Sequence, residues 1–173
     1  MRKVVVLALL ICSLAFAARA AERDGFTIAL SLIIGERSRD SHAETTNIRL
    51  EGDKLTYEQT YSGAGASKRK SEHLEFKLKS GEVERLKSLV KEQKLTGTGS
   101  LRFEPAAGQF NYFELNIKVT LRGIIATQEL SGPRGAANIK DERVYQKSVA
   151  LLRELYRLIN LRDKEISYQE PAG

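Results

Sequence analysis

Three side chains able to bind a metal ion recur at every second position in one short segment: Asp40, His42 and Glu44. In an extended backbone alternate side chains point the same way, so the three would project together. Nitrogen and oxygen donors of this kind, with one position left open, are what catalytic zinc uses. Arg37 and Arg39 in the same stretch oppose a dication, and no second histidine is near. We therefore interpret the segment as a solvated loop and predict no metal site.

Nucleophilic and acid catalysis have few candidate residues. A Ser-His-Asp triad would have to use His42 or His73, and no Gly-x-Ser-x-Gly segment is present. A carboxylate pair of the glycosidase kind can meet in the fold whatever its spacing, and Glu104, Glu114 and Glu129 are available. Because there is no tryptophan, an aromatic platform for a sugar has to come from tyrosine or phenylalanine. We predict no catalytic residues and no cofactor; a hydrolase whose acids and histidines assemble only in the fold is the alternative.

Lys68, Arg69 and Lys70 are the most partner-like surface feature of the chain. They lie within residues 62–71, which contain two glycines and no apolar periodicity and therefore predict a flexible basic loop. Clustered cations at a loop attract anionic lipid headgroups, polyanionic glycans or acidic proteins. Charge runs are more often simply solvated. We keep the three as candidate partner-binding residues for an envelope protein or an anionic surface.

The first twenty residues have the three parts of a secretory signal peptide. Arg2 and Lys3 precede an apolar run over residues 4–18, and the small residues Ala18 and Ala20 suit cleavage after Ala20. The apolar run is about fifteen residues long, whereas spanning a bilayer takes roughly twenty. Cleavage is therefore favoured over a membrane anchor. We predict a periplasmic or secreted protein with no transmembrane segment after cleavage.

Cys12 is the only cysteine, and it lies inside that apolar run. Ile11 stands where a lipoprotein has a small residue, which disfavours lipidation of Cys12. Without residues 1–20 the chain has no thiol, so it has neither a disulfide nor thiol chemistry. The same residues carry three basic side chains and no acidic one, so the net charge falls from +6 to +3. This small excess does not indicate nucleic acid as a partner.

Apolar residues at every second position predict the strands. Gly52 with Asp53, and Arg122 with Gly123, suit the tight turns of two hairpins. The alternating segments are residues 26–34, 48–50, 55–57, 74–78, 113–121 and 124–130. Polar or glycine-rich stretches predict connecting loops at residues 36–46, 62–71 and 131–138, a break at 97–99, and a loop through Pro105 and Gly108.

Two segments change to the helical period of 3.6. Residues 81–95 and 145–160 each carry one apolar stripe and predict amphipathic helices. Ser80 is the expected N-cap of the first helix, and Gly97 is its expected end. The residues from about 162 onward are polar and end in proline and glycine, so we expect a frayed tail.

Hairpins imply antiparallel pairing, and the helical stripes need an apolar surface to cover. We therefore predict an α+β fold over residues 21–173, with a single antiparallel sheet of about five to seven strands packed by two amphipathic helices. No internal repeat or linker divides this segment, which favours one domain.

A few local features also occur together in known domains: the turn at Gly52 and Asp53, the Leu-x-x-Leu helix that follows Ser80, and a proline loop at Pro133 before the last helix. In these features the chain resembles uncharacterised exported bacterial α+β domains. The resemblance implies an α+β fold and no catalytic residues. We predict an exported, non-catalytic module that binds a protein or cell-envelope component. Besides the hydrolase, the other alternative is a binder of a small apolar ligand enclosed by the apolar faces at 26–34 and 113–121.

Overall fold

The computed structural model describes residues 25–36, 41–63, 65–104, 110–135 and 137–172. The strands are β1 (Thr27–Glu36), β2 (His42–Glu51), β3 (Lys54–Gly63), β4 (Glu72–Lys77), β5 (Gly99–Arg102), β6 (Asn111–Leu121) and β7 (Ile124–Pro133). The helices are α2 (Ser80–Glu92), α3 (Ala137–Asp141), α4 (Arg143–Asn160) and the short 3-10 helix η1 (Ala66–Lys68).

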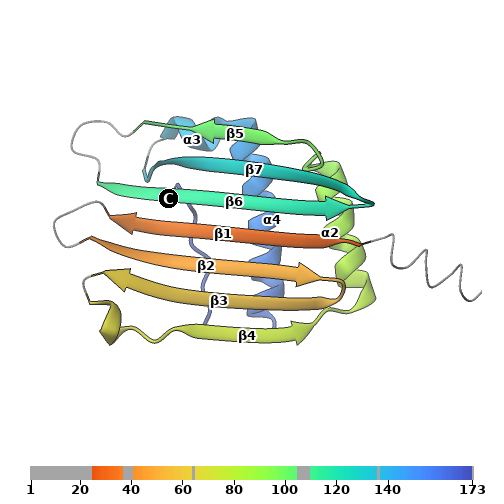
Figure 1. Cartoon of the computed structure of the whole chain (residues 1–173), viewed down its shortest axis with the longest axis horizontal. Helices are drawn as coiled ribbons and strands as arrows, with labels where there is room; N and C mark the ends of the chain where they lie inside the picture. The colour runs from red at the N-terminus through yellow and green to blue at the C-terminus, as the bar shows by residue number, and fades with distance from the viewer. Residues whose placement is uncertain (1–24, 37–40, 64, 105–109, 136, 173) are drawn as a thin grey trace, which may run out of the picture.

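Within these residues seven strands form one sheet, in the order β4-β3-β2-β1-β6-β7-β5. All neighbouring strands are antiparallel except β5, which runs parallel to β7. Helices α2 and α4 lie behind the sheet in Figure 1, and α4 crosses the strands from the β5 edge toward the β4 edge. The predicted α+β class is confirmed, with the parallel β5 as its one departure from an antiparallel sheet.

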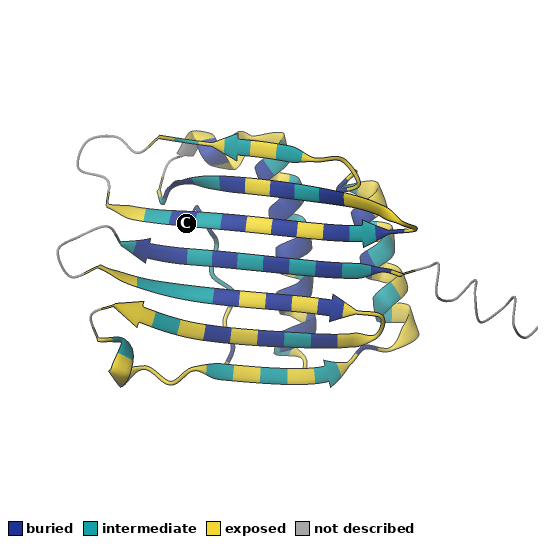
Figure 2. Ribbon diagram, in the orientation of Figure 1, coloured by how far each residue is buried: buried dark blue, intermediate teal, exposed yellow. Residues whose placement is uncertain are grey.

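Strand register brings the apolar positions onto one side. Ile28 lies between Leu50 of β2 and Val119 of β6, and Leu30 lies between Ile48 and Ile117. All of these side chains are buried. Figure 2 shows the resulting alternation of buried and less buried positions along each strand. A period of two in the sequence thus becomes one apolar face of the sheet.

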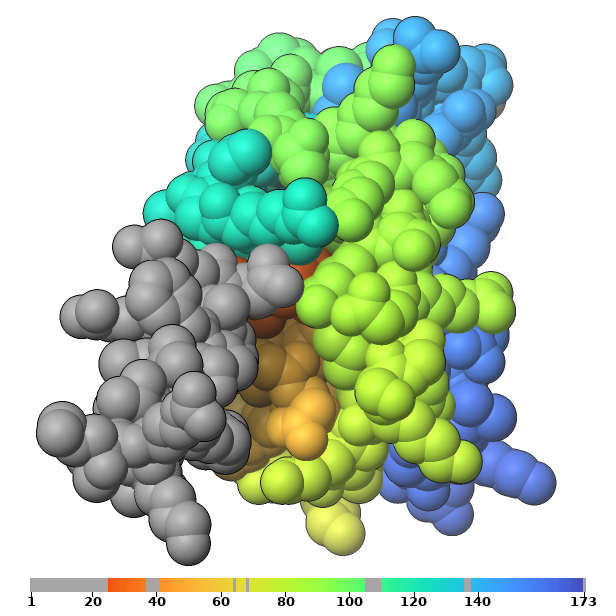
Figure 3. Space-filling view, turned by 90° about the vertical axis from the view of Figure 1, so that its right-hand side faces the viewer, coloured from red at the N-terminus to blue at the C-terminus, as the bar shows by residue number. Residues whose placement is uncertain are grey.

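The second layer of the molecule is built from amphipathic helices. In α4 the buried residues include Val149, Leu152, Leu155 and Tyr156, the stripe expected from the sequence. Viewed from the end of the sheet in Figure 3, α2 and α4 lie on one side of the strands. No helix in the described part of the chain is long and apolar enough to cross a membrane.

Turn geometry matches the two predicted hairpins. Gly52 has a φ of 63° between β2 and β3, while Arg122 and Gly123 have φ values of 52° and 78° between β6 and β7. At the β6–β7 turn, two successive residues in the left-handed region give the twist that suits a two-residue hairpin. Glycine adopts this region without the steric cost that a Cβ imposes.

Residues 42–46 belong to β2, so the expectation of a surface loop over 36–46 is wrong for this part. His42 pairs with Glu36 of β1 and with Gly63 of β3, so the backbone of β2 has a paired strand on both sides here. β-branched Thr45 and Thr46 favour the extended conformation. The sequence pattern did not predict this part of the strand, because its core-facing residues are Glu44 and Thr46 rather than aliphatic ones.

Strand structure also extends into other expected loops. β3 continues to Gly63, β7 continues to Pro133, and the break at 97–99 leads directly into β5. β5 has only four residues and pairs with a strand distant in sequence, so no hairpin signal precedes it. Helix α3 begins within the loop expected over 131–138 and continues to Asp141.

The predicted caps of the first helix are wrong. Lys79 is the N-cap of α2, and its backbone N–H donates to the Glu82 carboxylate over 2.8 Å. At the other end the chain turns at Lys94, which has a φ of 53°, three residues before Gly97. The Leu95 N–H then donates to the carbonyl of Val90 over 2.9 Å. Glu82 at N3 thus makes the bond to the N-cap N–H that the glutamate of a capping box makes.

The C-terminal segment, residues 161–172, is packed rather than frayed as expected. Ile166 is 3% exposed and Ala172 is fully buried. The Ala172 N–H donates to the Tyr145 hydroxyl over 3.1 Å, and its carbonyl accepts from the Gly135 N–H. In Figure 1 the segment returns behind the sheet beside α4 and ends near β6. Its apolar residues are too few and too unevenly spaced to give a periodic signal.

Candidate functional site

The sheet has one side that no described helix covers, and we call this side the uncovered face. It faces the viewer in Figures 1 and 2. On the central strand β1 it carries small residues, among them Ala29 and Ser31. Longer polar side chains point from the neighbouring strands at the same level, because Ala29 lies between Arg49 and Lys118. Small residues between long ones leave a depression along the middle of the sheet.

This depression, the central hollow, has a volume of about 550 Å³. Ala29 and Ser31 form its floor, and its lining extends to Asn47 on β2, Glu58 on β3 and Asn116 on β6. Amides and charged groups therefore dominate its walls. Such a surface can make hydrogen bonds with a polar ligand, and it also exposes apolar atoms.

A second depression of about 350 Å³ lies where β5 and β7 end and β6 begins. We call it the aromatic hollow, because Phe110 and Tyr112 line it. Polar and charged side chains from three strands complete its lining. They include Ser100, Arg102, Glu114, Asn116, Glu129 and Ser131. Asn116 lines both hollows, so the two depressions adjoin on one face.

The aromatic pair has a defined arrangement. Phe110 is 55% exposed, and it is the only exposed aromatic side chain in the described ranges. Tyr112 is opposite Gly35 in the register of β6 and β1. A Cβ on Gly35 would lie 2.8 Å from the Tyr112 ring, so the ring rests directly on the glycine. The absence of a side chain at Gly35 thus lets Tyr112 lie across the sheet.

Three carboxylates line the aromatic hollow: Glu104, Glu114 and Glu129. Glu114 is opposite Ser131 and Glu129 is opposite Asn116 in the pairing of β6 with β7, so the two acids are diagonal neighbours. Glu104 pairs with Arg102 at 3.2 Å on the rim. These are the three acids that the sequence offered for a carboxylate pair, and the fold brings them to one depression.

The covered side of the sheet holds a different polar cluster. The buried Tyr57 hydroxyl donates to Gln59 over 2.7 Å, and the Gln59 amide donates to Glu44. Gln169 of the C-terminal segment also donates to Glu44, over 3.4 Å. Burial raises the pKa of Tyr57, with a further contribution from the nearby Tyr156. The cluster joins the C-terminal segment to the sheet and is enclosed, so it serves the fold.

Glu170 holds the same segment to α4. It accepts hydrogen bonds from the Tyr145 and Tyr168 hydroxyls and from Arg153, each at 2.8 Å. Burial opposes ionisation of Glu170, yet the bonds from Arg153, Tyr168 and Tyr145 together hold its pKa below the ordinary value. The carboxylate is therefore ionised and fully used as an acceptor.

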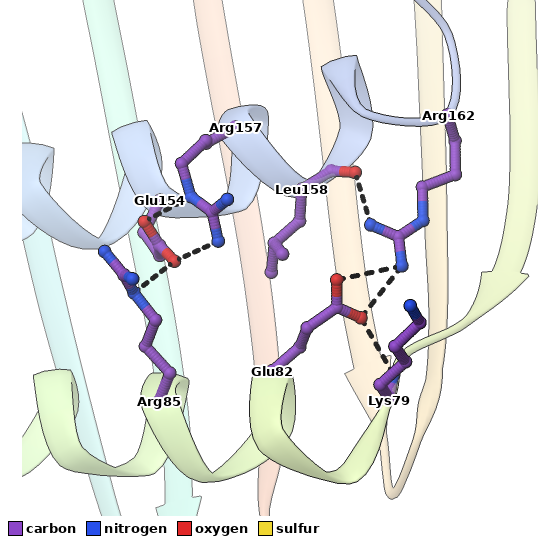
Figure 4. Close-up of polar contacts among 7 residues, drawn as sticks. All are labelled: Lys79, Glu82, Arg85, Glu154, Arg157, Leu158 and Arg162. Carbon is purple, nitrogen blue, oxygen red and sulfur yellow. Dashed lines mark hydrogen bonds and ion pairs between the residues drawn. The ribbon is translucent and has the colours of Figure 1, made fainter.

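A groove between α2 and α4 on the outer side of the helix layer is occupied by ion pairs. Figure 4 shows Glu154 between Arg85 and Arg157, each 2.8 Å away. It also shows Arg162 donating to both carboxylate oxygens of Glu82. Hydrogen bonding from Arg162 lowers the pKa of Glu82. Arg85 and Arg157 share one carboxylate, so ion-paired side chains line this groove.

Of the three residues considered as metal ligands, the structure describes His42 and Glu44. His42 and Glu44 lie on the same side of β2, but Asp40 is outside the described residues. His42 lies 3.7 Å from Glu36, while Glu44 accepts from Gln59 and Gln169. In the part of the chain that the structure describes, no three His, Cys, Asp or Glu side chains could hold a metal ion.

His73 points to the uncovered face, on the other side of β4 from Leu74, and its Nδ1 is 3.3 Å from Glu58. The partner candidates lie at the β4 edge of the sheet, far from the aromatic hollow beside β5. There Lys68 ends η1, Arg69 sits 5.2 Å from the centre of the Tyr61 ring, and Lys70 is exposed. The structure does not bring the histidines, the basic group and the acids together.

Sequence reasoning did not identify Phe110, Tyr112 or Asn116 as site residues. One signal was present: Phe110, Tyr112 and Glu114 recur at every second position, on the polar side of a strand whose other side is apolar. Aromatic residues on the polar side of a strand indicate a surface role. Comparison with known proteins gives no further guidance, because no protein-family profile and no curated protein sequence matches the chain.

Proposed function

We propose that this protein is an exported, non-catalytic module, periplasmic or secreted, that binds a component of the cell envelope through the uncovered face of its sheet. Support for export comes from the signal-peptide pattern of residues 1–20. Support for binding comes from one observation above all: the uncovered face carries two adjoining hollows with polar side chains in their lining, and one of them also has aromatic residues. Concave sites with a few convergent polar groups are where ligands usually bind.

The alternative of an enclosed apolar ligand has less support. The faces considered for it, on β1 and β6, are covered by the helix layer, and their aliphatic residues form part of one continuous core. Leu32 of β1 and Leu115 of β6, for example, are at most 2% exposed. Burial of such side chains stabilises the fold by about 1.5–3 kcal/mol each, so no ligand is needed to explain them.

Binding by the uncovered face can be tested with a matched pair of substitutions. Ser31→Arg places a long cation in the central hollow, whereas Ser88→Arg makes the same change on exposed α2. We expect the wild-type protein and Ser88→Arg to sediment with isolated cell-envelope material, and Ser31→Arg to remain in solution. Equal sedimentation of the two variants, or none by the wild type, would contradict the proposal.

Export has its own test. We expect the protein in the periplasmic or culture fraction to begin at Ala21 when its N-terminus is sequenced. Recovery of chains that start at Met1 from the cytoplasm would contradict export without bearing on the binding face.

A glycoside hydrolase is the second candidate, because Glu104, Glu114 and Glu129 line the same hollow. Enzymes of this class use two carboxylates on either side of the scissile bond. If the protein is such an enzyme, incubation with an oligosaccharide releases new reducing ends, and both Glu114→Gln and Glu129→Gln abolish the release. No release by the wild type favours the binding module.

A further inference from the structure

We propose that the aromatic hollow binds a saccharide unit that carries no acidic group. This inference rests on the proposed envelope-binding function and names the ligand class of the same face. It is carried by the combination of a depression, two aromatic rings and side chains that both donate and accept hydrogen bonds. Among the described residues, the central hollow has no aromatic side chain in its lining, and the α2–α4 groove is occupied by ion pairs. A further depression on α4 is lined by Tyr156, Tyr168 and Asn160, but Tyr156 is only 2% exposed there.

The aromatic rings supply the apolar contact that a sugar ring needs. Single exposed apolar residues are common on protein surfaces. Phe110 is different, because it lines a depression next to a second ring, Tyr112, that lies against Gly35. The carbon–hydrogen face of a sugar ring can pack on such side chains, since aromatic residues combine a large apolar area with a flat surface. Phenylalanine and tyrosine here take the place of the tryptophan that the chain lacks.

The polar lining suits hydroxyl groups better than a simple cation. Sugar hydroxyls donate and accept hydrogen bonds, and Asn116, Ser100 and Ser131 can do both. The lysine or arginine side chain of a basic peptide only donates hydrogen bonds, so it could bind the carboxylates but leave the donors of the hollow without a partner. Arg102 on the rim would also repel its positive charge. The balance of donors and acceptors therefore favours a saccharide over a basic peptide.

Charge decides which saccharides fit. The aromatic hollow has three carboxylates, Glu104, Glu114 and Glu129, against one arginine, Arg102. Like charges brought together without water between them repel strongly. Uronic acids and phosphorylated glycans are therefore disfavoured, and neutral or amino sugars are favoured. A volume of about 350 Å³ is at the small end for a ligand site, so the hollow takes a short unit, and a longer chain would continue past Asn116 into the central hollow.

Calorimetric titration of the purified protein with three probes tests this inference: the tetramer of N-acetylglucosamine, tetragalacturonate and tetralysine. We expect only the neutral tetramer to bind. Phe110→Ala is expected to weaken its binding by about tenfold, as loss of an aromatic contact does. Ile125→Ala is the matched control, because Ile125 is 60% exposed at the other end of β7. It should bind as the wild type does.

Tyr112→Leu provides a second variant that keeps an apolar side chain over Gly35 and removes the ring. Weaker binding by both variants, with unchanged thermal midpoints, supports the inference. It is overturned if tetragalacturonate or tetralysine binds instead of the neutral tetramer, if no probe binds, or if Phe110→Ala binds as tightly as Ile125→Ala. If the saccharide test fails while Ser31→Arg still prevents sedimentation with envelope material, only the saccharide is rejected. If the wild-type protein itself does not sediment, the envelope-binding function is rejected.

Discussion

The two faces of the sheet share one backbone but differ in what their side chains accomplish. On β6, Leu115 is fully buried on the covered face, while its neighbours Glu114 and Asn116 line a hollow on the other face. The covered face is filled by α2, α4 and the C-terminal segment. On the uncovered face, small residues beside long ones leave depressions in the surface. Alternate residues of one strand can therefore serve stability and recognition separately.

The largest difference between the faces should appear in stability. Leu115→Ala removes a fully buried side chain, and we expect it to lower the free energy of unfolding by about 2–5 kcal/mol. Asn116→Ala, one residue along, should change it by less than about 0.5 kcal/mol. Guanidinium denaturation of both variants at neutral pH measures this. Comparable losses would show that the uncovered face also supports the fold.

The C-terminal segment should behave as part of the covered side. Glu170→Ala leaves Tyr145, Tyr168 and Arg153 without their shared acceptor, so we expect a loss of about 1–3 kcal/mol. Exposed Glu165 is the control, and Glu165→Ala should be nearly neutral. Limited proteolysis gives an independent measurement. We expect the C-terminal segment to be cleaved faster in Glu170→Ala than in the wild type, and at the wild-type rate in Glu165→Ala. Equal cleavage in both variants would contradict the packing role.

Gly35 connects the two faces, because it allows the Tyr112 ring to lie across the sheet. Gly35→Ala should push the ring aside at a cost of about 1 kcal/mol and weaken binding of the neutral tetramer. Gly97→Ala is the control, since a Cβ at Gly97 meets nothing within 4 Å. Chemical shifts of the Tyr112 ring report the displacement. Unchanged shifts in Gly35→Ala would mean that the glycine does not position the ring.

The ion pairs of the helix layer predict a dependence of stability on pH. Glu82 has a lowered pKa in the folded protein because Arg162 donates to it. A carboxylate of this kind stabilises the fold above its unfolded pKa, about 4.3, and this contribution is lost as the pH falls through the lower folded value. Denaturation across pH 2–7 should show that the free energy of unfolding falls less in acid for Glu82→Gln than for the wild type. Glu84→Gln is the control: a hydrogen bond from Lys87 also lowers the pKa of Glu84, but solvent screens this exposed carboxylate, so its substitution should change the pH dependence less.

The smallest effect is expected from the basic group at the β4 edge. Changing Lys68, Arg69 and Lys70 to serine should leave stability and saccharide binding unaltered, since the aromatic hollow lies at the opposite edge. Association with anionic vesicles at low salt should fall, because each cation near such a surface contributes about 1 kcal/mol. Unchanged vesicle binding at both low and high salt would remove these residues as partner candidates.

Local patterns predicted most of the fold. The aliphatic strands, both hairpin turns and the two amphipathic helices occur where the periodicity placed them, with ends shifted by a few residues. The failures have two causes. Residues 42–46 pair with nearby β1, but their polar side chains give no apolar alternation. β5 and the C-terminal segment have weak local signals and are held by partners far along the chain, such as Gln128 and Glu129 for β5. The same limit applies to the site, because Glu104, Glu114 and Glu129 could be named as acids but not placed together.

The amino-acid sequence by itself determined which residues are apolar at a period of two or 3.6, where glycine permits a turn, and which reactive side chains are absent. These properties depend on neighbours within a few residues. Only the tertiary structure decided that β5 joins the sheet in parallel, that the tail packs beside α4, and that Phe110 and Tyr112 lie beside three carboxylates. Each of these outcomes requires contacts between distant segments, and their free energy exists only once the two layers have formed.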